Sequence, residues 1–189
     1  MYLDINYQMI VQIITGILAF IPALVANPFA VVSGGGRPID FGKKINDKRI
    51  LGDGKTWKGL FGGGFSGGII GFLLYIGASS WLELYPSFNQ ALIIPFTLSF
   101  GALIGDIGGS FFKRRMGKER GEETIGIDQY DFFLGSIFFC LLLNRNWFEN
   151  TYFFGQGRIT LIILLVGVHL LHRVVNIIGY KIGLKKEPW

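Results

Sequence analysis

The sequence has few charged residues and almost no cysteine. The single cysteine, Cys140, cannot form an internal disulfide, and within an apolar run it is most simply a small packing residue. Only 16% of the residues are charged, whereas 50% are hydrophobic. This composition excludes an ordinary soluble domain and indicates an integral membrane protein.

Several motifs that would name a function at once are also missing. Residues 52–56, GDGKT, invite comparison with a phosphate-binding P-loop, but the first glycine of that motif would fall at Arg49, and no strand precedes it. The D-G-x-x-A-R pattern of CDP-alcohol phosphotransferases is absent, which disfavours that class of enzyme. The chain also shows no obvious inverted repeat of the kind found in many transporters.

Long apolar runs, in contrast, are plentiful. Five runs of roughly 20 residues are each long enough to cross a hydrocarbon core of about 30 Å. We therefore predict an all-α integral membrane protein, a bundle of about five transmembrane helices in which residues 1–189 form a single catalytic domain. The predicted spans are 9–32, 59–79, 91–112, 125–143 and 159–179, of which the fourth is the shortest.

The basic residues are concentrated in particular loops. Residues 33–58, residues 113–127 and the tail after Gly179 hold fifteen of the eighteen Lys and Arg residues. By the positive-inside rule the N-terminus is outside, and the two long loops and the C-terminus are cytoplasmic. The net charge of +5 is explained by this topology, so we expect no nucleic-acid partner, and we expect the active site to face the cytoplasm from the cell membrane.

Glycine and proline interrupt the first two apolar runs. Glycines 59, 63, 67 and 71 form a ridge without side chains, which favours close helix packing over the alternative of a flexible or ligand-contacting helix. In the first run, Pro22, Asn27 and Pro28 predict a kink or an early helix end near Ala26. That irregularity is either a simple helix end or the wall of a water-filled cavity.

Two further groups of side chains have competing interpretations. Aromatic residues in the outer connections, such as Trp81, Tyr85, Trp147 and Tyr152, suit a belt at headgroup level. In the last run, a polar stripe of interhelical hydrogen-bonding groups is the slightly preferred interpretation, although Arg173 is expected to face the bundle interior and counter an acid or a phosphate. The stripe consists of His169, His172, Arg173 and Asn176.

Three carboxylates at the mouths of apolar runs are the strongest functional signal. Asp128 and Asp131 are three residues apart and share a helix face, and Asp106 lies roughly 10 Å before the end of its own helix. Acids near hydrocarbon are usually there for a cation, a proton or a substrate. We predict that all three hold one Mg²⁺, although Asp128 could instead be an N-cap and Asp131 a first-turn acid.

Basic side chains beside these acids predict an anion site. In the second loop some of them could only stop the helix at the cytoplasmic face, but we expect a subset to bind phosphate. In the first loop, exposed backbone N–H groups of Gly52 and Gly54 adjoin further bases, although a simple positive-inside loop is the alternative. The candidate phosphate-binding residues are Lys55, Thr56, Lys58, Lys113, Arg114, Arg115, Lys118 and Arg120.

The segment from Gly105 to Asp131 resembles the signature of CDP-diacylglycerol synthases. It contains Gly105 and Asp106, then Ser110 followed by a Lys-Arg pair, a Lys-acid pair, and the final D-x-x-D. It departs from the bacterial pattern at Glu119 and Gln129 and lacks the preceding His-Gly-Gly. The whole chain is more similar to the archaeal branch, the CDP-archaeol synthase family, through ANP at 26–28, GGGRPIDFGK at 34–43 and RILGDGKTWKG at 49–59.

This resemblance implies a reaction and a set of roles. The expected activity is the Mg²⁺-dependent transfer of a cytidylyl group from CTP to the prenylated lipid 2,3-bis-O-(geranylgeranyl)-sn-glycerol 1-phosphate, with release of pyrophosphate. Asp106, Asp128, Asp131 and Lys113 are the expected catalytic residues. Ser110, Lys55, Thr56, Lys58, Arg114, Arg115 and Lys118 are the expected nucleotide-binding residues. The resemblance also implies five helices around a cytoplasm-facing polar cavity.

A small cation- or proton-coupled transporter is the alternative from a different class, because intramembrane Asp, His and Arg residues also build ion relays. The clustering of the acids at one membrane face, beside the long loops, argues against it. The sequence does not give the oligomeric state, the number of metal ions or the residues that contact cytosine.

Overall fold

The computed structural model describes residues 2–78, 81–119, 122, 124 and 126–184, with the side chains of residues 2–5 and 172 left aside. Within these ranges the protein is almost entirely helical, as predicted, with one small antiparallel hairpin. Its elements are α1 (Tyr2–Val32), β1 (Lys44–Ile45), β2 (Lys48–Arg49), α2 (Trp57–Ala78), α3 (Phe88–Arg115), α4 (Ile127–Leu143), α5 (Arg145–Tyr152) and α6 (Gly157–Lys181).

Four of the described helices, α1, α2, α3 and α6, are long and apolar enough to cross a membrane. The fourth run of the prediction corresponds to α4, which has 17 residues and is therefore about 26 Å long. That length is just under the thickness of a typical hydrocarbon core of about 30 Å. The structure thus supports a multi-pass membrane protein, with α4 as a shorter helix packed along α3.

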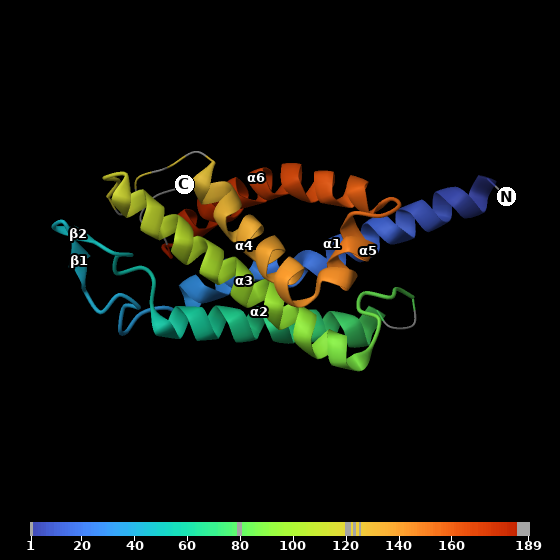
Figure 1. Cartoon of the computed structure of the whole chain (residues 1–189), viewed down its shortest axis with the longest axis horizontal. Helices are drawn as coiled ribbons and strands as arrows, with labels where there is room; N and C mark the ends of the chain where they lie inside the picture. The colour runs from blue at the N-terminus through green and yellow to red at the C-terminus, as the bar shows by residue number, and fades with distance from the viewer. Residues whose placement is uncertain (1, 79–80, 120–121, 123, 125, 185–189) are drawn as a thin grey trace.

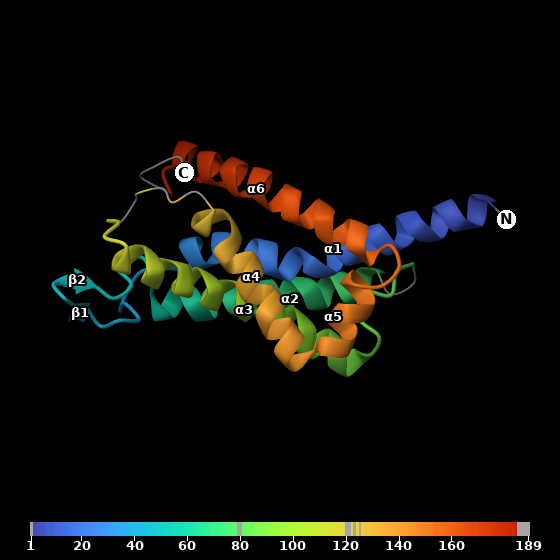
Figure 2. The ribbon, with the colours of Figure 1, turned by 45° about the horizontal axis from the view of Figure 1, so that its top comes forward.

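The long helices run along the longest axis of the molecule (Figure 1). The N-terminus of α1 lies at one end, whereas the β1–β2 hairpin, the end of α3, the beginning of α4 and the last turn of α6 lie at the other. In the rotated view α6 lies along one side of the bundle, over α1 (Figure 2). The described parts of both basic loops are therefore gathered at one end, and the side of the membrane that this end faces stays a prediction.

The glycine ridge of α2 packs against neighbouring helices, which confirms the packing interpretation. A Cβ atom at Gly63 would lie 2.8 Å from the Cβ of Ala30 on α1, and one at Gly67 would lie 2.7 Å from the carbonyl oxygen of Pro22. Such separations are shorter than real Cβ atoms tolerate. Only glycine at these positions lets α1 and α2 approach so closely.

The predicted early end of the first helix near Ala26 is wrong. Helix α1 continues through Pro22 and Pro28 as far as Val32. Proline is tolerated in membrane helices where neighbouring elements compensate for the lost backbone hydrogen bond, and Pro22 is fully buried against the α2 glycines. The helix thus ends at Val32, which is the end of the predicted span 9–32, and the alternative of a kink near Ala26 stays a prediction.

The expected aromatic belt is also wrong for most of its members. Trp81 is exposed, but Tyr85, Trp147 and Tyr152 are buried in the core. Their polar atoms find backbone acceptors, since the Tyr152 hydroxyl donates to the Gly16 carbonyl at 2.8 Å and the Tyr85 hydroxyl donates to the Ala19 carbonyl at 3.0 Å. These bonds remove the cost of burying the hydroxyls, so the rings can fill the centre of the bundle.

Candidate active site

The candidate site is built on a close crossing of α3 and α4. A Cβ atom at Gly105 would lie 2.9 Å from the Cα of Gly135, and one at Gly109 would lie 2.8 Å from the Cβ of Asp131. Gly101, one turn earlier on α3, faces Gly135 in the same way. This second glycine ridge was not recognised in the sequence, although its four-residue spacing was visible there.

The crossing brings Asp131 of α4 beside Asp106 of α3, as predicted. Their carboxylates are near enough to interact electrostatically. The Oδ1 atom of Asp131 accepts a hydrogen bond from the backbone N–H of Phe132 at 2.6 Å, whereas its buried Oδ2 atom has no hydrogen-bond partner among the described residues. A buried carboxylate oxygen without a donor is costly, so it is a strong candidate for binding a cation or a substrate group.

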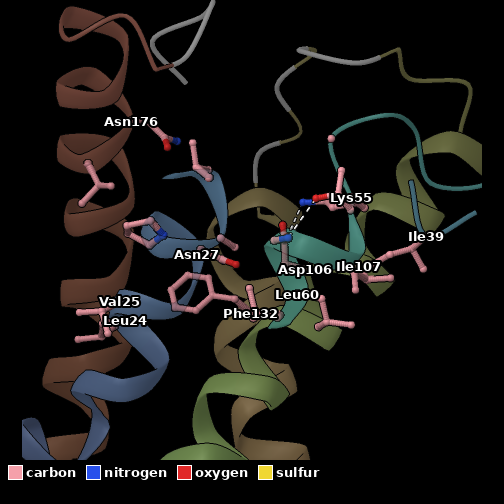
Figure 3. A pocket seen from close by; sticks show the side chains of 18 of the residues that line it. Leu24, Val25, Asn27, Ile39, Lys55, Leu60, Asp106, Ile107, Phe132 and Asn176 are labelled. Carbon is pink, nitrogen blue, oxygen red and sulfur yellow. Dashed lines mark hydrogen bonds and ion pairs between the residues drawn. The ribbon is translucent and has the colours of Figure 1, made fainter. Parts of the chain in front are cut away.

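A cavity of about 550 Å³ opens beside Asp106, between the first loop and helices α1, α2, α3, α4 and α6, and Asp131 is not part of its described wall. Its polar wall contains Lys55, Thr56 and Asp106, and Asn27 and Pro28 of α1 also line it. This part of α1 is therefore a cavity wall, although it is regular helix, and a water-filled cavity stays a prediction. The rest of the wall is largely apolar and includes Leu24, Val25, Leu103, Phe132, Leu171 and Val175. Figure 3 shows Lys55 and Asp106 side by side with the apolar Leu60 and Ile107 close to them, whereas Asn176 lies on α6, away from that pair.

An ion pair joins the first loop to α3 at this polar wall. The Nζ atom of Lys55 donates to the Oδ2 atom of Asp106, and Figure 3 shows the two side chains pointing toward each other. Both side chains are about one quarter exposed, so the pair faces the cavity without being freely solvated. The neighbouring Thr56 is buried, and its hydroxyl accepts a hydrogen bond from Gly59 N–H at 3.1 Å, which caps the start of α2.

A second ion pair lies about two turns further along α3. Lys113 donates to the Oδ1 atom of Asp128, and the Oδ2 atom of Asp128 accepts the backbone N–H of Thr124 at 2.8 Å. Helix α4 begins after Gly126, so Asp128 lies in the first helical turn, and the alternative that it is the N-cap is wrong. Asp131 is one turn further into the helix and is not a first-turn acid either.

The remaining predicted site residues divide into two groups. Arg115 donates to the carbonyl oxygens of Ile45, Lys48 and Arg49, and so fastens the β1–β2 hairpin to α3. The other side chains, among the residues that the structure describes, also lie outside the cavity wall. Arg114 donates hydrogen bonds to the backbone carbonyls of Leu51 and Lys118. The Lys118 side chain forms an ion pair with Glu122. The side chain of Lys58 is exposed, whereas that of Ser110 is buried. Arg120 lies outside the described residues, and the phosphate-binding roles of this set remain predictions.

The carboxylates fit a divalent cation only in part. In the described part of the chain, no three Asp, Glu, His or Cys side chains are grouped closely enough to form a complete metal site. Asp106 and Asp131 nevertheless offer hard oxygen ligands, and the unpartnered Oδ2 of Asp131 can accept a cation. Mg²⁺ commonly takes one or two carboxylates and completes its shell with water and substrate phosphate, so this pair suits it. Participation of Asp128 remains a prediction.

Sequence reasoning assigned no role to Asp40, which the structure shows at the centre of the first loop. Burial alone would raise the pKa of this carboxyl group. Hydrogen bonds from Arg49 and from the backbone N–H groups of Leu51, Gly52 and Gly42 outweigh that effect and hold the pKa well below its usual range. The Asp40 carboxylate therefore stays ionised and binds several groups of the loop at once. Its spacing from Arg49 was visible in the sequence, but such a contact across a turn leaves no periodic signal.

The described members of the polar stripe on α6 lie in different surroundings. Asn176 is buried and lines the cavity, and the His169 ring stacks on Tyr130 of α4 with a centroid separation of 6.4 Å. Arg173 is exposed, so the expectation that it faces the bundle interior is wrong. The side chain of His172 lies outside the described residues.

The cavity has an ion pair at its wall, is otherwise mostly apolar, and lies between membrane helices. This arrangement suits an intramembrane enzyme. A solved structure agrees with this class. The chain resembles a protein described as an intramembrane enzyme for archaeal membrane lipids biosynthesis, with a TM-score of 0.59 and 34% identity over 80% of this chain and 90% of that one.

Sequence comparisons define the family. The family model "CarS-like: CDP-archaeol synthase" matches residues 7–189, and the chain belongs to this family. It is 45% identical over 178 residues to the CDP-archaeol synthase of Methanosarcina barkeri, covering 89% of this chain and 99% of the relative. It is 41% identical over 184 residues to that of Picrophilus torridus, covering 95% and 98%. The predicted resemblance is therefore confirmed, and the transporter alternative is not supported.

Proposed function

We propose that this protein transfers the cytidylyl group of CTP to the phosphate of 2,3-bis-O-(geranylgeranyl)-sn-glycerol 1-phosphate, as a CDP-archaeol synthase of archaeal lipid biosynthesis. The observation that carries the proposal is the cavity, whose wall holds the Lys55–Asp106 pair and is otherwise largely apolar. Phosphate groups suit the surroundings of this pair, and prenyl chains suit the apolar wall. Family membership supports the same substrates.

The bond changes require little from the protein in the way of proton transfer. An oxygen of the lipid phosphomonoester attacks the α-phosphorus of CTP, the bond to the bridging oxygen of the β-phosphate breaks, and pyrophosphate leaves with that electron pair. The nucleophile is already an anion, so no serine or histidine need be deprotonated. Catalysis then depends on bringing two anions together and on neutralising the departing one.

The charged side chains of the site supply these functions. Lys55 lies at the cavity wall, where its ammonium group can contact the triphosphate. Lys113 adds positive charge about two turns after Asp106 on α3. Asp106 and Asp131, with Asp128 as a further candidate, would hold Mg²⁺, which when bound supplies positive charge to the phosphate oxygens. When a cation and a nucleotide bind, Lys55 can exchange its carboxylate partner for phosphate, which keeps both charges paired.

The proposed location follows from the arrangement of charge. The two basic loops and the polar wall of the cavity lie at one end of the bundle, and the positive-inside rule assigns basic loops to the cytoplasm. We therefore propose a multi-pass protein of the cell membrane whose active site faces the cytoplasm. That side also holds CTP, which is a soluble substrate.

The direct test uses the purified protein with labelled CTP and Mg²⁺, with or without the prenylated glycerol phosphate. Pyrophosphate release and labelled lipid should appear together and only when the lipid phosphate is present. Dephosphorylated lipid is the matched control, because it has the same chains but lacks the nucleophile. Pyrophosphate release that is independent of lipid phosphate would contradict the proposal.

A further inference from the structure

The Asp40 carboxylate is bound from several directions within the first loop. Its side chain is 1% exposed, and its Oδ1 atom accepts from Arg49 Nη2 at 2.8 Å and from Gly42 N–H at 3.1 Å. Its Oδ2 atom accepts from Leu51 N–H at 3.0 Å, Gly52 N–H at 3.1 Å and Arg49 Nε at 3.3 Å. One carboxylate thus joins the segment before the β1–β2 hairpin to the segment after it.

Both segments that Asp40 joins also hold the backbone of Lys55. The N–H of Ile39, the residue next to Asp40, donates to the Lys55 carbonyl at 2.8 Å. On the other side, the N–H of Lys55 donates to the carbonyl of Gly52 at 3.3 Å, and Gly52 is itself bound by Asp40. The position of Lys55 is therefore fixed through two residues that Asp40 holds in place.

The loop is also fastened to the helix that carries the acid of the site. Arg115 on α3 donates to the carbonyl of Arg49 at 2.7 Å and to that of Ile45 at 3.0 Å. The hairpin is thereby anchored to α3, the helix from which Asp106 faces Lys55. Among the residues that the structure describes, Asp40 is not part of the cavity wall, whereas its neighbour Ile39 is.

We propose that Asp40 is a positioning residue that holds Lys55 at the cavity wall, so that nucleotide affinity depends on a carboxylate that does not touch the nucleotide. The inference rests on the proposed function for its link to CTP, but the position of Lys55 can be measured without any substrate. Loss of the Asp40 charge should release the Gly52 turn and leave Lys55 free to leave Asp106.

Asp40→Asn tests this inference, and Asp53→Asn is its matched control. Asp53 pairs with the same Arg49 side chain, but its side chain is largely exposed, and in the described part of the chain it makes no hydrogen bond to Ile39, Gly52 or Lys55. In the protein without substrate, acetylation of Lys55 by an amine-specific reagent, measured relative to the exposed Lys44, should be severalfold faster in Asp40→Asn. It should be unchanged in Asp53→Asn. Equal Lys55 labelling in wild type and Asp40→Asn would overturn the inference.

Calorimetry with CTP and Mg²⁺ provides the second measurement. Asp40→Asn should weaken CTP binding by about ten- to one-hundredfold, the range expected when a hydrogen bond to a charged group is lost. In a Lys55→Ala background the same substitution should weaken it by less than about twofold, because the two residues act in series. A loss of the same size in both backgrounds would show that Asp40 does not act through Lys55.

Two controls keep the outcomes separate. If Asp40→Asn does not fold, Arg49→Lys keeps the charge but loses the two-pronged contact with Asp40, and it should raise Lys55 labelling in the same way. If wild-type protein binds no CTP, the proposed function fails, whereas the labelling comparison still decides whether Asp40 positions Lys55.

Discussion

Replacing Gly105 with alanine tests whether the site depends on the close contact between α3 and α4. A Cβ atom at this position would lie 2.9 Å from the Cα of Gly135 and closer still to the carbonyl oxygen of Asp131. Both are backbone atoms, so no side chain can rotate away. The helices must separate by on the order of 1 Å, and overpacking of this kind costs about 1–3 kcal/mol.

Gly108→Ala is the matched control within the same helix. A Cβ atom at Gly108 meets nothing within 4 Å, so that variant gains the helix propensity of alanine without a clash. Because both substitutions gain the same propensity, Gly105→Ala should be less stable by about 1–3 kcal/mol in thermal unfolding of the purified protein.

Activity should fall further than stability does. Separation of the helices moves Asp131 away from Asp106, and a displacement of about 1 Å can cost about 100-fold in rate. Lipid-dependent pyrophosphate release should therefore be greatly reduced in Gly105→Ala at temperatures where the variant is fully folded. If Gly105→Ala matched Gly108→Ala in stability and wild type in rate, the reasoning about the crossing would be refuted.

Three further substitutions test other contacts. Lys113→Ala should weaken CTP binding more than lipid binding in calorimetry, whereas the exposed Lys44→Ala should not, and unchanged nucleotide affinity would remove Lys113 from the site. In Arg115→Lys, the lysine side chain cannot bind the hairpin carbonyls as the planar guanidinium does, so proteolytic cleavage of the hairpin should be faster than in wild type. Equal cleavage rates would contradict the anchoring role of Arg115. Tyr152→Phe loses the buried hydrogen bond to Gly16 and should unfold about 1 kcal/mol more easily, and stability equal to wild type would show that this bond contributes nothing.

Much of the fold follows from patterns that repeat along the chain. Apolar runs predicted the long helices, and the four-residue glycine spacing predicted that α2 packs closely against a neighbouring helix, because both signals depend on a residue's own helix. The continuous course of α1 through Pro22 and Pro28 could not be predicted in this way. It depends on the packing of Pro22 against the α2 glycines, which is a contact between segments far apart in the sequence.

The individual side chains of the site were easier to predict from the sequence than the contacts that hold the first loop in place. The sequence indicated that Asp106 and Asp131 lie together and that Lys55 suits phosphate, and the structure places Lys55 and Asp106 in one ion pair at a cavity. It did not indicate that Asp40 organises the loop, or that Arg115 binds backbone carbonyls. Those roles depend on the path of an irregular loop, which no periodicity records.

In the proposed mechanism, Asp131 and Asp106 form a shared charged centre at which the two substrates meet. The most direct test is the rate of lipid-dependent pyrophosphate release by purified Asp131→Asn, compared with Asp53→Asn as a control for loss of an exposed acid. Asparagine has nearly the same shape, so the bundle should remain folded, and we expect the rate to fall by at least about 100-fold while the control stays active. A folded Asp131→Asn protein with nearly the wild-type rate would contradict the account.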